Sequence, residues 1–274
     1  GGIGVSGNDL DIDSSYSAIG GLSAYSTGRN IYLIEAQEVV DPGDGDLYIH
    51  EVGTTAVGAE DQPTAFIMAP GRILNHRTDG GSNVASGKTR LFAGDDIGEE
   101  SKPLQTAVGF IEGRSTDGSV WIENTGALAV GGLTEEEGIV AEGSVHLGAS
   151  SPVRVQKNIR TRGPNENIVV TANDDADDSP GNEDHITIES GIELVAEQGA
   201  VILRAGDDII LQEGALIQAS AVLEVGVESG DLPAGAGAVV DTVSDGFKRL
   251  TLSGTPNDGE TWTIRVDGAS YSYD

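Results

Sequence analysis

The chain is built from short runs in which apolar and polar residues alternate, bounded by Gly, Asn or Asp. Alternation with period two puts every second side chain on one face, and the runs are rich in β-branched residues, so each run predicts a β-strand. Every stretch with apolar residues at helical spacing is interrupted by Gly or by Asp and Ser, so the pattern predicts no α-helix. The clearest runs are 30–34, 46–50, 119–123, 144–147, 167–171, 185–189 and 200–204.

One part of this pattern occurs twice. An Ile-Gly pair is followed by Leu six residues after the Gly and then by a strand-like run. The copies begin at Ile3 and Ile97, and their strand-like runs begin at Ile31 and Val120. Imperfect self-similarity of this kind is typical of stacked, repetitive architectures.

Shorter strings recur as well. Ala-Gly-Asp-Asp-Ile follows a strand at 93–97 and again at 205–209, and several strands open with Gly-Asp or Gly-Ser. From Asp184 to Val225, strands recur every eight or nine residues. Two or three such strands give a coil of about 20–25 residues, the short end of known repeat periods.

These strands favour a parallel β-solenoid. One short strand cannot bury its apolar face alone, but parallel strands about 4.8 Å apart would pile Val, Ile and Leu into continuous rows. Gly and Asn tolerate the left-handed backbone conformation that tight corners need. Narrow coils have little room for rings, in keeping with an aromatic content of 4%. The alternative is an antiparallel β-sandwich, which also has strands every 8–12 residues.

The pattern divides the chain into three parts. Residues 1–226 are expected to form the parallel β-helix, and residues 227–240 a Gly- and Ala-rich linker. Residues 241–274 contain two alternating runs, 248–254 and 260–268, which predict a small hairpin module. The chain starts with Gly1 and stops just after a strand-like run, so we expect it to be a segment of a longer protein.

Residues 1 to about 225 resemble a known family. The segment 97–123 carries Ile-Gly, a spacer, Pro-Leu, a further spacer and Gly-Ser-Val-Trp-Ile-Glu, after the string Leu-Phe-Ala-Gly-Asp-Asp-Ile-Gly. These strings are similar to the repeat unit of filamentous-haemagglutinin-like adhesins and related giant bacterial surface proteins. The resemblance implies a right-handed parallel β-helix, export to the cell surface, and a role in adhesion or surface fibres. The chain departs from that pattern at Asp9, where the first copy lacks the Pro.

Composition narrows the partners. The chain has 45 Asp and Glu against 15 Lys and Arg, a net charge of −30, which argues against binding to nucleic acid or an anionic membrane. No apolar run approaches the ~20 residues that span a bilayer, so we expect no membrane insertion. The absence of Cys excludes disulfides and Cys-based metal sites. A hydrophobic content of 38% is too high for wholesale disorder.

Two acidic stretches are candidate calcium sites. Calcium takes six to eight oxygen ligands, and Asp alternating with Gly lets a short loop wrap the ion. Neither stretch matches an EF-hand loop or the nonapeptide calcium repeat, so a solvated acidic turn that keeps the protein soluble is the competing interpretation. The candidate ligands are Asp41, Asp44 and Asp46 in the first stretch and Asp174, Asp175, Asp177, Asp178 and Asp184 in the second.

Other titratable residues favour structural roles. The pairs Asp95-Asp96 and Asp207-Asp208 lie in a repeated string, which predicts a corner turn rather than a catalytic pair. The sole basic concentration, 154–162, is expected to pair with neighbouring acids. The four histidines lack the i, i+4 spacing of a zinc helix, and we expect ordinary surface positions for them. They are His50, His76, His146 and His185.

The leading hypothesis is a non-catalytic structural or adhesive segment of an exported bacterial surface fibre. Unpaired strand edges template further pairing, so copies are expected to associate head-to-tail or laterally. A surface glycan or a host-cell receptor is a possible partner, with no cofactor beyond possible Ca²⁺. The alternative is a glycan-binding or polysaccharide-cleaving β-helix, whose site would need carboxylates clustered with a Lys or Arg on one face.

Overall fold

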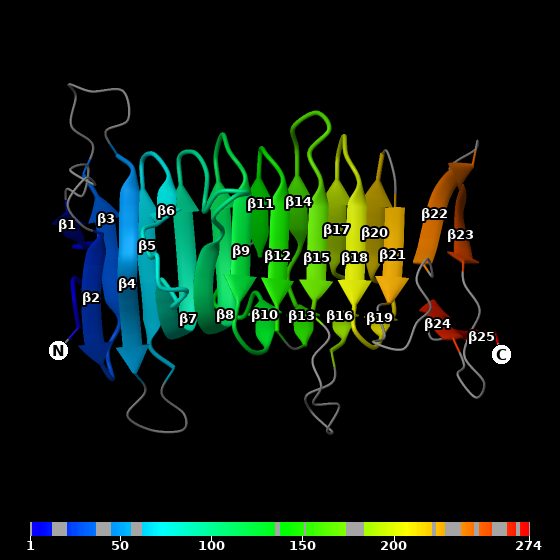
Figure 1. Ribbon diagram of the computed structural model, residues 1–274, viewed down its shortest axis with the longest axis horizontal. Coiled ribbons are helices and arrows are strands. Elements are labelled where there is room, and N and C mark those ends of the chain that lie inside the picture. Colours follow the sequence, from blue (N-terminus) through cyan, green and yellow to red (C-terminus); the bar gives the residue numbers. More distant parts are fainter. Residues whose placement is uncertain are drawn as a thin grey trace.

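Parallel strands wound into a β-solenoid of about seven turns make up most of the protein in the computed structural model (Figure 1). The structure describes residues 2–12, 21–36, 45–55, 62–134, 138–150, 152–173, 184–220, 223–227, 237–243, 247–253, 262–266 and 269–273. These residues contain strands and no helix. Every pairing between strands from β1 to β21 is parallel, so the predicted parallel β-helix is confirmed and the antiparallel sandwich is excluded.

The longest strands lie in the N-terminal half of the rod, and the strands from β9 to β21 are three to five residues long. The N-terminal half holds β1 (Leu10–Ile12), β2 (Leu22–Thr27), β3 (Ile31–Glu35), β4 (Leu47–Thr55), β5 (Thr64–Ala69), β6 (Ile73–Asn75), β7 (Val84–Ala93) and β8 (Leu104–Ser115). The next coils hold β9 (Val120–Asn124), β10 (Leu128–Val130), β11 (Ile139–Ala141), β12 (Val145–Ala149), β13 (Val153–Val155), β14 (Ile159–Thr161), β15 (Ile168–Ala172), β16 (Ile186–Ile188), β17 (Glu193–Ala196), β18 (Val201–Ala205), β19 (Ile209–Leu211), β20 (Leu216–Ala219) and β21 (Leu223–Val227).

From β9 onward each coil contributes one strand to each of three sheets. The front sheet in Figure 1 contains β9, β12, β15, β18 and β21, the lower sheet β10, β13, β16 and β19, and the back sheet β11, β14, β17 and β20. The chain descends the near face, rises along the far face and advances toward the C-terminal end, which makes the solenoid right-handed (Figure 1).

Coil lengths follow from the register of the front sheet. The first paired residues are Val120, Val145, Ile168, Val201 and Leu223, which follow each other at intervals of 25, 23, 33 and 22 residues. Three of the four intervals match the predicted period. The longest contains 174–183, which lies outside the described residues.

Long strands that bend round a corner shape the N-terminal half. β7 pairs with β4 through Val84 and with β5 through Lys88 to Ala93, so one strand belongs to two faces. The bend falls at Gly87, and β8 bends beside it at Gly109, where the register of the two strands is interrupted. β8 then pairs with β9, β10 and β11, so one long strand is followed by three short ones.

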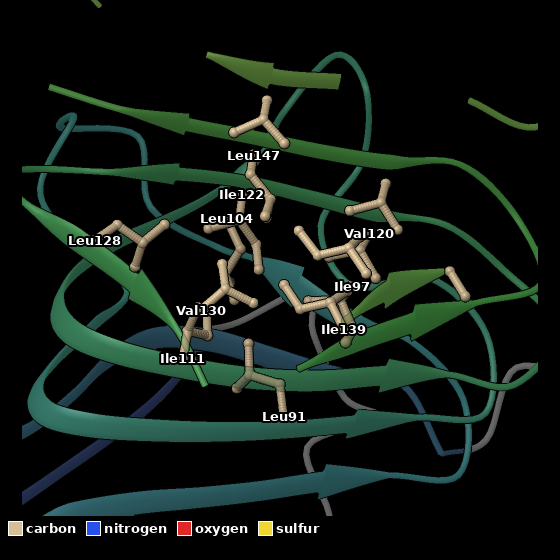
Figure 2. Packing of buried hydrophobic residues seen from close by; sticks show 14 of the residues in the cluster. Leu91, Ile97, Leu104, Ile111, Val120, Ile122, Leu128, Val130, Ile139 and Leu147 are labelled. Carbon is tan, nitrogen blue, oxygen red and sulfur yellow. The ribbon is translucent and has the colours of Figure 1, made fainter. Parts of the chain in front are cut away.

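The core is a set of aliphatic rows along the axis. In the front sheet, inward residues alternate with outward ones, and Val120, Val145, Ile168 and Val201 are all fully buried. Figure 2 shows how such side chains from successive coils meet inside the solenoid. Among the described residues no aromatic ring belongs to this core, in keeping with the low aromatic content of the chain. Burial of this kind contributes about 25 cal/mol per Å² of apolar surface.

The repeated Ile-Gly unit adopts the same local structure twice. Ile3 bridges Ile31, and Ile97 bridges Val120, each in parallel with the next coil. Both copies then make a tight antiparallel turn, at Val5–Asn8 and at Glu99–Lys102. The Gly in each has positive φ, 61° and 71°, which only Gly adopts readily. The sequence repeat therefore marks a structural repeat.

The C-terminal strands are antiparallel, but they pair differently from the prediction. β22 (Gly237–Val243) joins the edge of β21 and forms a hairpin with β23 (Phe247–Ser253). β24 (Trp262–Val266) pairs with β25 (Ala269–Tyr273). The runs 248–254 and 260–268 thus both supply strands, but these strands pair with β22 and β25 and not with each other. β22 also begins inside 227–240, where a linker was expected.

Candidate functional site

A row of side-chain oxygens holds one corner of the solenoid, and we call it the corner ladder. It consists of Asp96, Ser119, Ser144 and Asn167, each placed directly before the first front-sheet residue of its coil. The backbone N–H of Ser119 donates to Asp96 Oδ1 (2.7 Å), that of Ser144 to Ser119 Oγ (3.0 Å), and that of Asn167 to Ser144 Oγ (2.9 Å). Ala200 N–H donates to Asn167 Oδ1 (2.8 Å) and ends the ladder, since Ala has no oxygen to continue it.

The Gly-Ser pairs of the sequence belong to this ladder. A Cβ at Gly118 would collide with Asp96 Oδ1, and a Cβ at Gly143 would collide with Ser119 Oγ. Each acceptor side chain therefore occupies the space that a side chain in the next coil would need. Gly in front of Ser is a packing requirement, and these hydroxyls are engaged in structure.

Asp46, a predicted calcium ligand, forms a salt bridge with Arg72. Its side chain is 9% exposed, and Asp46 Oδ2 lies 2.6 Å from Arg72 Nη2. Asp46 Oδ1 accepts the backbone N–H of Arg72 at 2.7 Å. Arg72 also pairs with Glu99 at 3.3 Å, and the carboxylate of Asp46 raises the pKa of Arg72. The carboxylate of Asp46 is thus engaged by Arg72, and calcium binding by Asp46 stays a prediction.

The second acidic stretch is described only at its end. Asp184 is fully buried, and its backbone N–H donates to Asp207 Oδ2 at 2.8 Å. The other predicted ligands, Asp41, Asp44, Asp174, Asp175, Asp177 and Asp178, lie outside the described residues. Within the described ranges no group of three or more His, Asp or Glu side chains is placed to hold a metal ion. Calcium binding by the two acidic loops stays a prediction.

The Asp-Asp pairs lie at corners, as predicted. Asp95-Asp96 follows β7 and Asp207-Asp208 follows β18, each in a bend before the next pairing. Burial, and then the neighbouring charge of Asp96, raises the pKa of Asp95 above its ordinary value. The carboxylates of Asp96 and Asp207 accept hydrogen bonds from backbone N–H groups of adjacent coils, so both pairs have a structural role.

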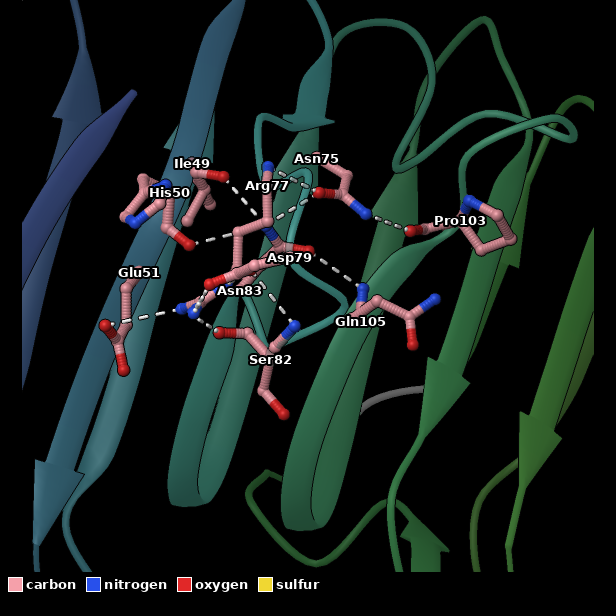
Figure 3. A network of polar contacts seen from close by, with 11 residues as sticks. Ile49, His50, Glu51, Asn75, Arg77, Asp79, Ser82, Asn83, Pro103 and Gln105 are labelled. Carbon is pink, nitrogen blue, oxygen red and sulfur yellow. Dashed lines mark hydrogen bonds and ion pairs between the residues drawn. The ribbon is translucent and has the colours of Figure 1, made fainter. Parts of the chain in front are cut away.

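A polar network fixes the segment between β6 and β7 (Figure 3). The Arg77 guanidinium pairs with Asp79 at 2.8 Å and with Glu51 at 3.3 Å. The Arg77 guanidinium holds the pKa of Asp79 far below its usual range. At the base of the segment, Asn83 Nδ2 donates to Asn75 Oδ1 at 3.0 Å. These charges satisfy one another, so the network positions a loop.

The basic stretch pairs with acids, as predicted. Arg154 contacts Glu189 at 2.6 Å, and Arg160 lies 3.6 Å from Glu193 and 3.3 Å from Glu197. All three contacts join one coil to the next. Paired in this way, Arg154 and Arg160 reinforce the stacking of coils.

Sequence reasoning missed an aromatic stack on the outer face of the front sheet. Trp121 and His146 are register partners in β9 and β12, and their rings lie 3.8 Å apart with planes 19° from parallel. Both side chains are half-buried. Burial lowers the pKa of His146, which favours a neutral imidazole at pH 7. The stack could not be predicted because it depends on the register of β9 and β12. That register follows from a coil of 25 residues, and Trp121 and His146 do not belong to a repeated string.

Glu123 lies beside this stack. It points outward from β9, opposite Gly148 in β12, and its carboxylate lies where a Cβ at Gly148 would be. Burial alone raises its pKa. Trp121, Glu123 and His146 together form what we call the Trp121 patch. Two other histidines make local contacts. The His76 ring packs edge-on against Tyr48, and His185 Nδ1 accepts the backbone N–H of Asp208.

Comparisons with known proteins give no relative. No family model matches the chain, and neither does any curated protein or solved structure. The fold defines a β-solenoid protein, while the likeness to haemagglutinin-like adhesins stays a prediction. In the described part of the chain, no helix has the length and hydropathy to cross a bilayer.

Proposed function

We propose that the chain is a non-catalytic structural and adhesive segment of an exported bacterial surface fibre. The supporting observation is the uninterrupted stack of inward aliphatic rows from Ile31 to Ala219, with parallel pairing from coil to coil. A rod of this kind is stiff because each coil is bonded along its length to both neighbours. Stiffness is what a protein needs to hold a binding surface away from a cell.

Self-association belongs to the same proposal. Strand edges are templates for pairing, and a solenoid has edges at its ends. A net charge of −30 opposes lateral contact between copies at low ionic strength, because like charges repel. We therefore expect association to increase with salt. Sedimentation at several protein and salt concentrations measures this, and a single species at every concentration would contradict it.

The decisive experiment on function has two measurements in the organism that encodes the chain. Antibodies raised against the segment should label intact cells, and protease added outside should remove that label. Deletion of the segment should reduce attachment to host cells or to a glycan-coated surface. Label found only after cell lysis, or unchanged attachment after deletion, would refute the proposal.

The Trp121 patch favours one part of the alternative, glycan binding. An outward indole next to a carboxylate and an imidazole can contact a sugar. Cleavage would need a second carboxylate or a cation placed against Glu123, and its register partners in the two adjacent strands are Gln105 and Gly148. Incubation with polysaccharides should therefore release no new reducing ends and no unsaturated products.

A further inference from the structure

The outward face of the front sheet carries two rows of side chains. One row runs from Trp121 through His146 to Val169 and Ile202. The parallel row runs from Gln105 through Glu123 and Gly148 to Thr171 and Arg204. Because Gly148 has no side chain, the Glu123 carboxylate lies across it. Trp121 and His146 precede Glu123 and Gly148 by two residues, so the stacked rings belong to the same face. The result is an apolar strip with a carboxylate along its edge.

The polar groups of the Trp121 patch have no protein partners within the described residues. The indole N–H of Trp121, the ring nitrogens of His146 and the carboxylate of Glu123 take part in no hydrogen bond or ion pair there. Groups of this kind are left for water or for a ligand. These groups belong to three residues on one face of the sheet, two of which form the ring stack.

Several outward arginines on the rod are paired. Arg154 is paired with Glu189, Arg160 with Glu193 and Glu197, and Arg77 with Asp79 and Glu51. Apart from Arg77–Asp79, which lies within one loop, these contacts join one coil to the next. The Trp121 patch differs from these pairs. It combines the ring stack of Trp121 and His146 with polar groups that have no hydrogen-bond partner among the described residues.

We propose that the Trp121 patch is a binding site for neutral glycans, with Trp121 as the platform for a sugar ring and Glu123 and His146 as hydrogen-bond partners for its hydroxyls. Sugars combine apolar C–H faces with hydroxyls that both donate and accept. An indole supplies the apolar surface, a carboxylate accepts, and a neutral imidazole does either. This site would be the surface through which the segment adheres, and to that extent the inference rests on the proposed adhesive function.

Charge decides between neutral and acidic glycans. His146 lies in the field of two acids, Glu100 and Glu166, and of one base, Arg204. Glu123 is a further acidic residue on the same outward face. The whole chain carries −30. A uronate or sulfate polymer would meet repulsion at the patch and from the rest of the rod. A neutral hexose chain meets none.

The test is a binding titration with cellohexaose, maltohexaose, mannohexaose and galactan, with polygalacturonate as the acidic probe. The protein has two tryptophans, so the W262F background makes fluorescence report on Trp121 alone. At least one neutral glycan should shift this fluorescence, with Kd in the range of about 0.1–1 mM expected for one small exposed site. Calorimetry on the unmodified chain should give the same Kd.

Variants locate the site. In calorimetry, which does not depend on the indole, Trp121→Ala should weaken binding at least tenfold. Glu123→Gln, which keeps the shape but replaces an acceptor oxygen with a donor, should weaken it about threefold or more. Tyr25→Ala removes an aromatic side chain that is 59% exposed elsewhere on the rod, and it should leave Kd unchanged. Glu123→Gln lies on the surface and should fold normally, so it keeps the test valid if Trp121→Ala is unstable.

Three results would overturn the inference: no neutral glycan binds, Glu123→Gln and Trp121→Ala bind as the parent does, or polygalacturonate binds more tightly than every neutral probe. Beads coated with the segment separate this inference from the proposed function. If beads carrying Trp121→Ala and parent beads adhere equally well to host cells, adhesion stands and the Trp121 patch is not its cause. If neither adheres, the adhesive function itself fails.

Discussion

The hydroxyl of Ser119 fills the space that a side chain at Gly143 would need, one coil further along the rod. The same oxygen accepts the backbone N–H of Ser144 at 3.0 Å. A single contact thus requires Gly at one position and an oxygen-bearing residue at another. It also ties the register of β12 to that of β9, because a slip by one residue would place a Cβ against the hydroxyl.

Gly143→Ala should destabilise the protein. The added methyl would meet Ser119 Oγ and the backbone of Gly118. Overpacking of this kind typically lowers the free energy of unfolding by about 1–3 kcal/mol. Urea denaturation followed by circular dichroism measures the loss as a lower midpoint. Adding Ser119→Ala in the double variant should recover part of it, because the two changes act on one contact.

Gly113→Ala is the matched control. A Cβ there would meet Leu91 O at 3.7 Å and Ile97 Cδ1 at 3.9 Å, which are ordinary contacts. The substitution should therefore leave the midpoint unchanged or raise it slightly, since Ala restricts the unfolded chain. Equal losses for Gly113→Ala and Gly143→Ala would mean that the corner contact is unimportant.

Opposite faces of one strand should respond very differently to truncation. Leu203 is fully buried in the core, whereas its neighbour Ile202 points outward from β18. Leu203→Ala should cost about 2–5 kcal/mol through lost burial and a cavity, and Ile202→Ala a small fraction of that. The urea midpoints of the two variants give the comparison, and similar losses would argue against the inward rows as the source of stability.

The architecture could be predicted because its causes are local. Alternation identifies a strand from its own residues, and the Gly of Ile3-Gly4 or Ile97-Gly98 marks a positive φ wherever the turn recurs. The corner at Asp95-Asp96 follows from a string that repeats at Asp207-Asp208. Each of these signals is complete within a few residues, so it survives without knowledge of the neighbouring coil.

Contacts between coils could not be predicted in the same way. Arg72 reaches Asp46 from 26 residues away, and Trp121 meets His146 only because one coil takes 25 residues. The length of a coil depends on inserts whose sequences carry no period. Strand alternation likewise does not say which strands pair, and β23 pairs with β22 rather than with β24.

The salt bridge of Asp46 and Arg72 should contribute more to stability than an exposed pair. Asp46→Ala leaves the Arg72 guanidinium and backbone N–H without that carboxylate. Breaking a buried pair costs about 3–5 kcal/mol, and we expect about 2–3 kcal/mol here because Arg72 is 34% exposed and keeps Glu99. Glu99→Gln is the control: its side chain is 43% exposed, so the loss should stay below about 1 kcal/mol.

Asp95 and Asp79 should have opposite effects on the pH dependence of stability. The folded-state pKa of Asp95 is raised by burial, so its ionised form opposes folding at pH 7 and the penalty disappears below the unfolded pKa of about 3.9. Asp95→Asn should therefore stabilise at pH 7, by a few tenths of a kcal/mol for this solvent-screened group, with no gain at pH 3.

The pKa of Asp79 is lowered by Arg77, so its contribution is present above the unfolded pKa and is lost as pH falls through the lower folded value. Asp79→Asn should destabilise at pH 7, and the difference from the parent should shrink as pH falls below about 3.9. Thermal melts from pH 3 to pH 8 report both variants. A shift of the same sign for both would contradict the assigned causes.

Calcium, if bound by the acidic loops, should stabilise the folded rod by mass action. An ion that binds only the native state at 100 times its Kd adds about 2.7 kcal/mol, which raises the melting midpoint by several degrees. Melts with calcium and with chelator test this directly. Replacing Asp174, Asp175, Asp177 and Asp178 by Asn should abolish the difference if the second loop holds the ion, whereas Asp46→Asn should not, because Asp46 is committed to Arg72. An identical midpoint with and without chelator would leave these carboxylates the role of keeping the protein in solution.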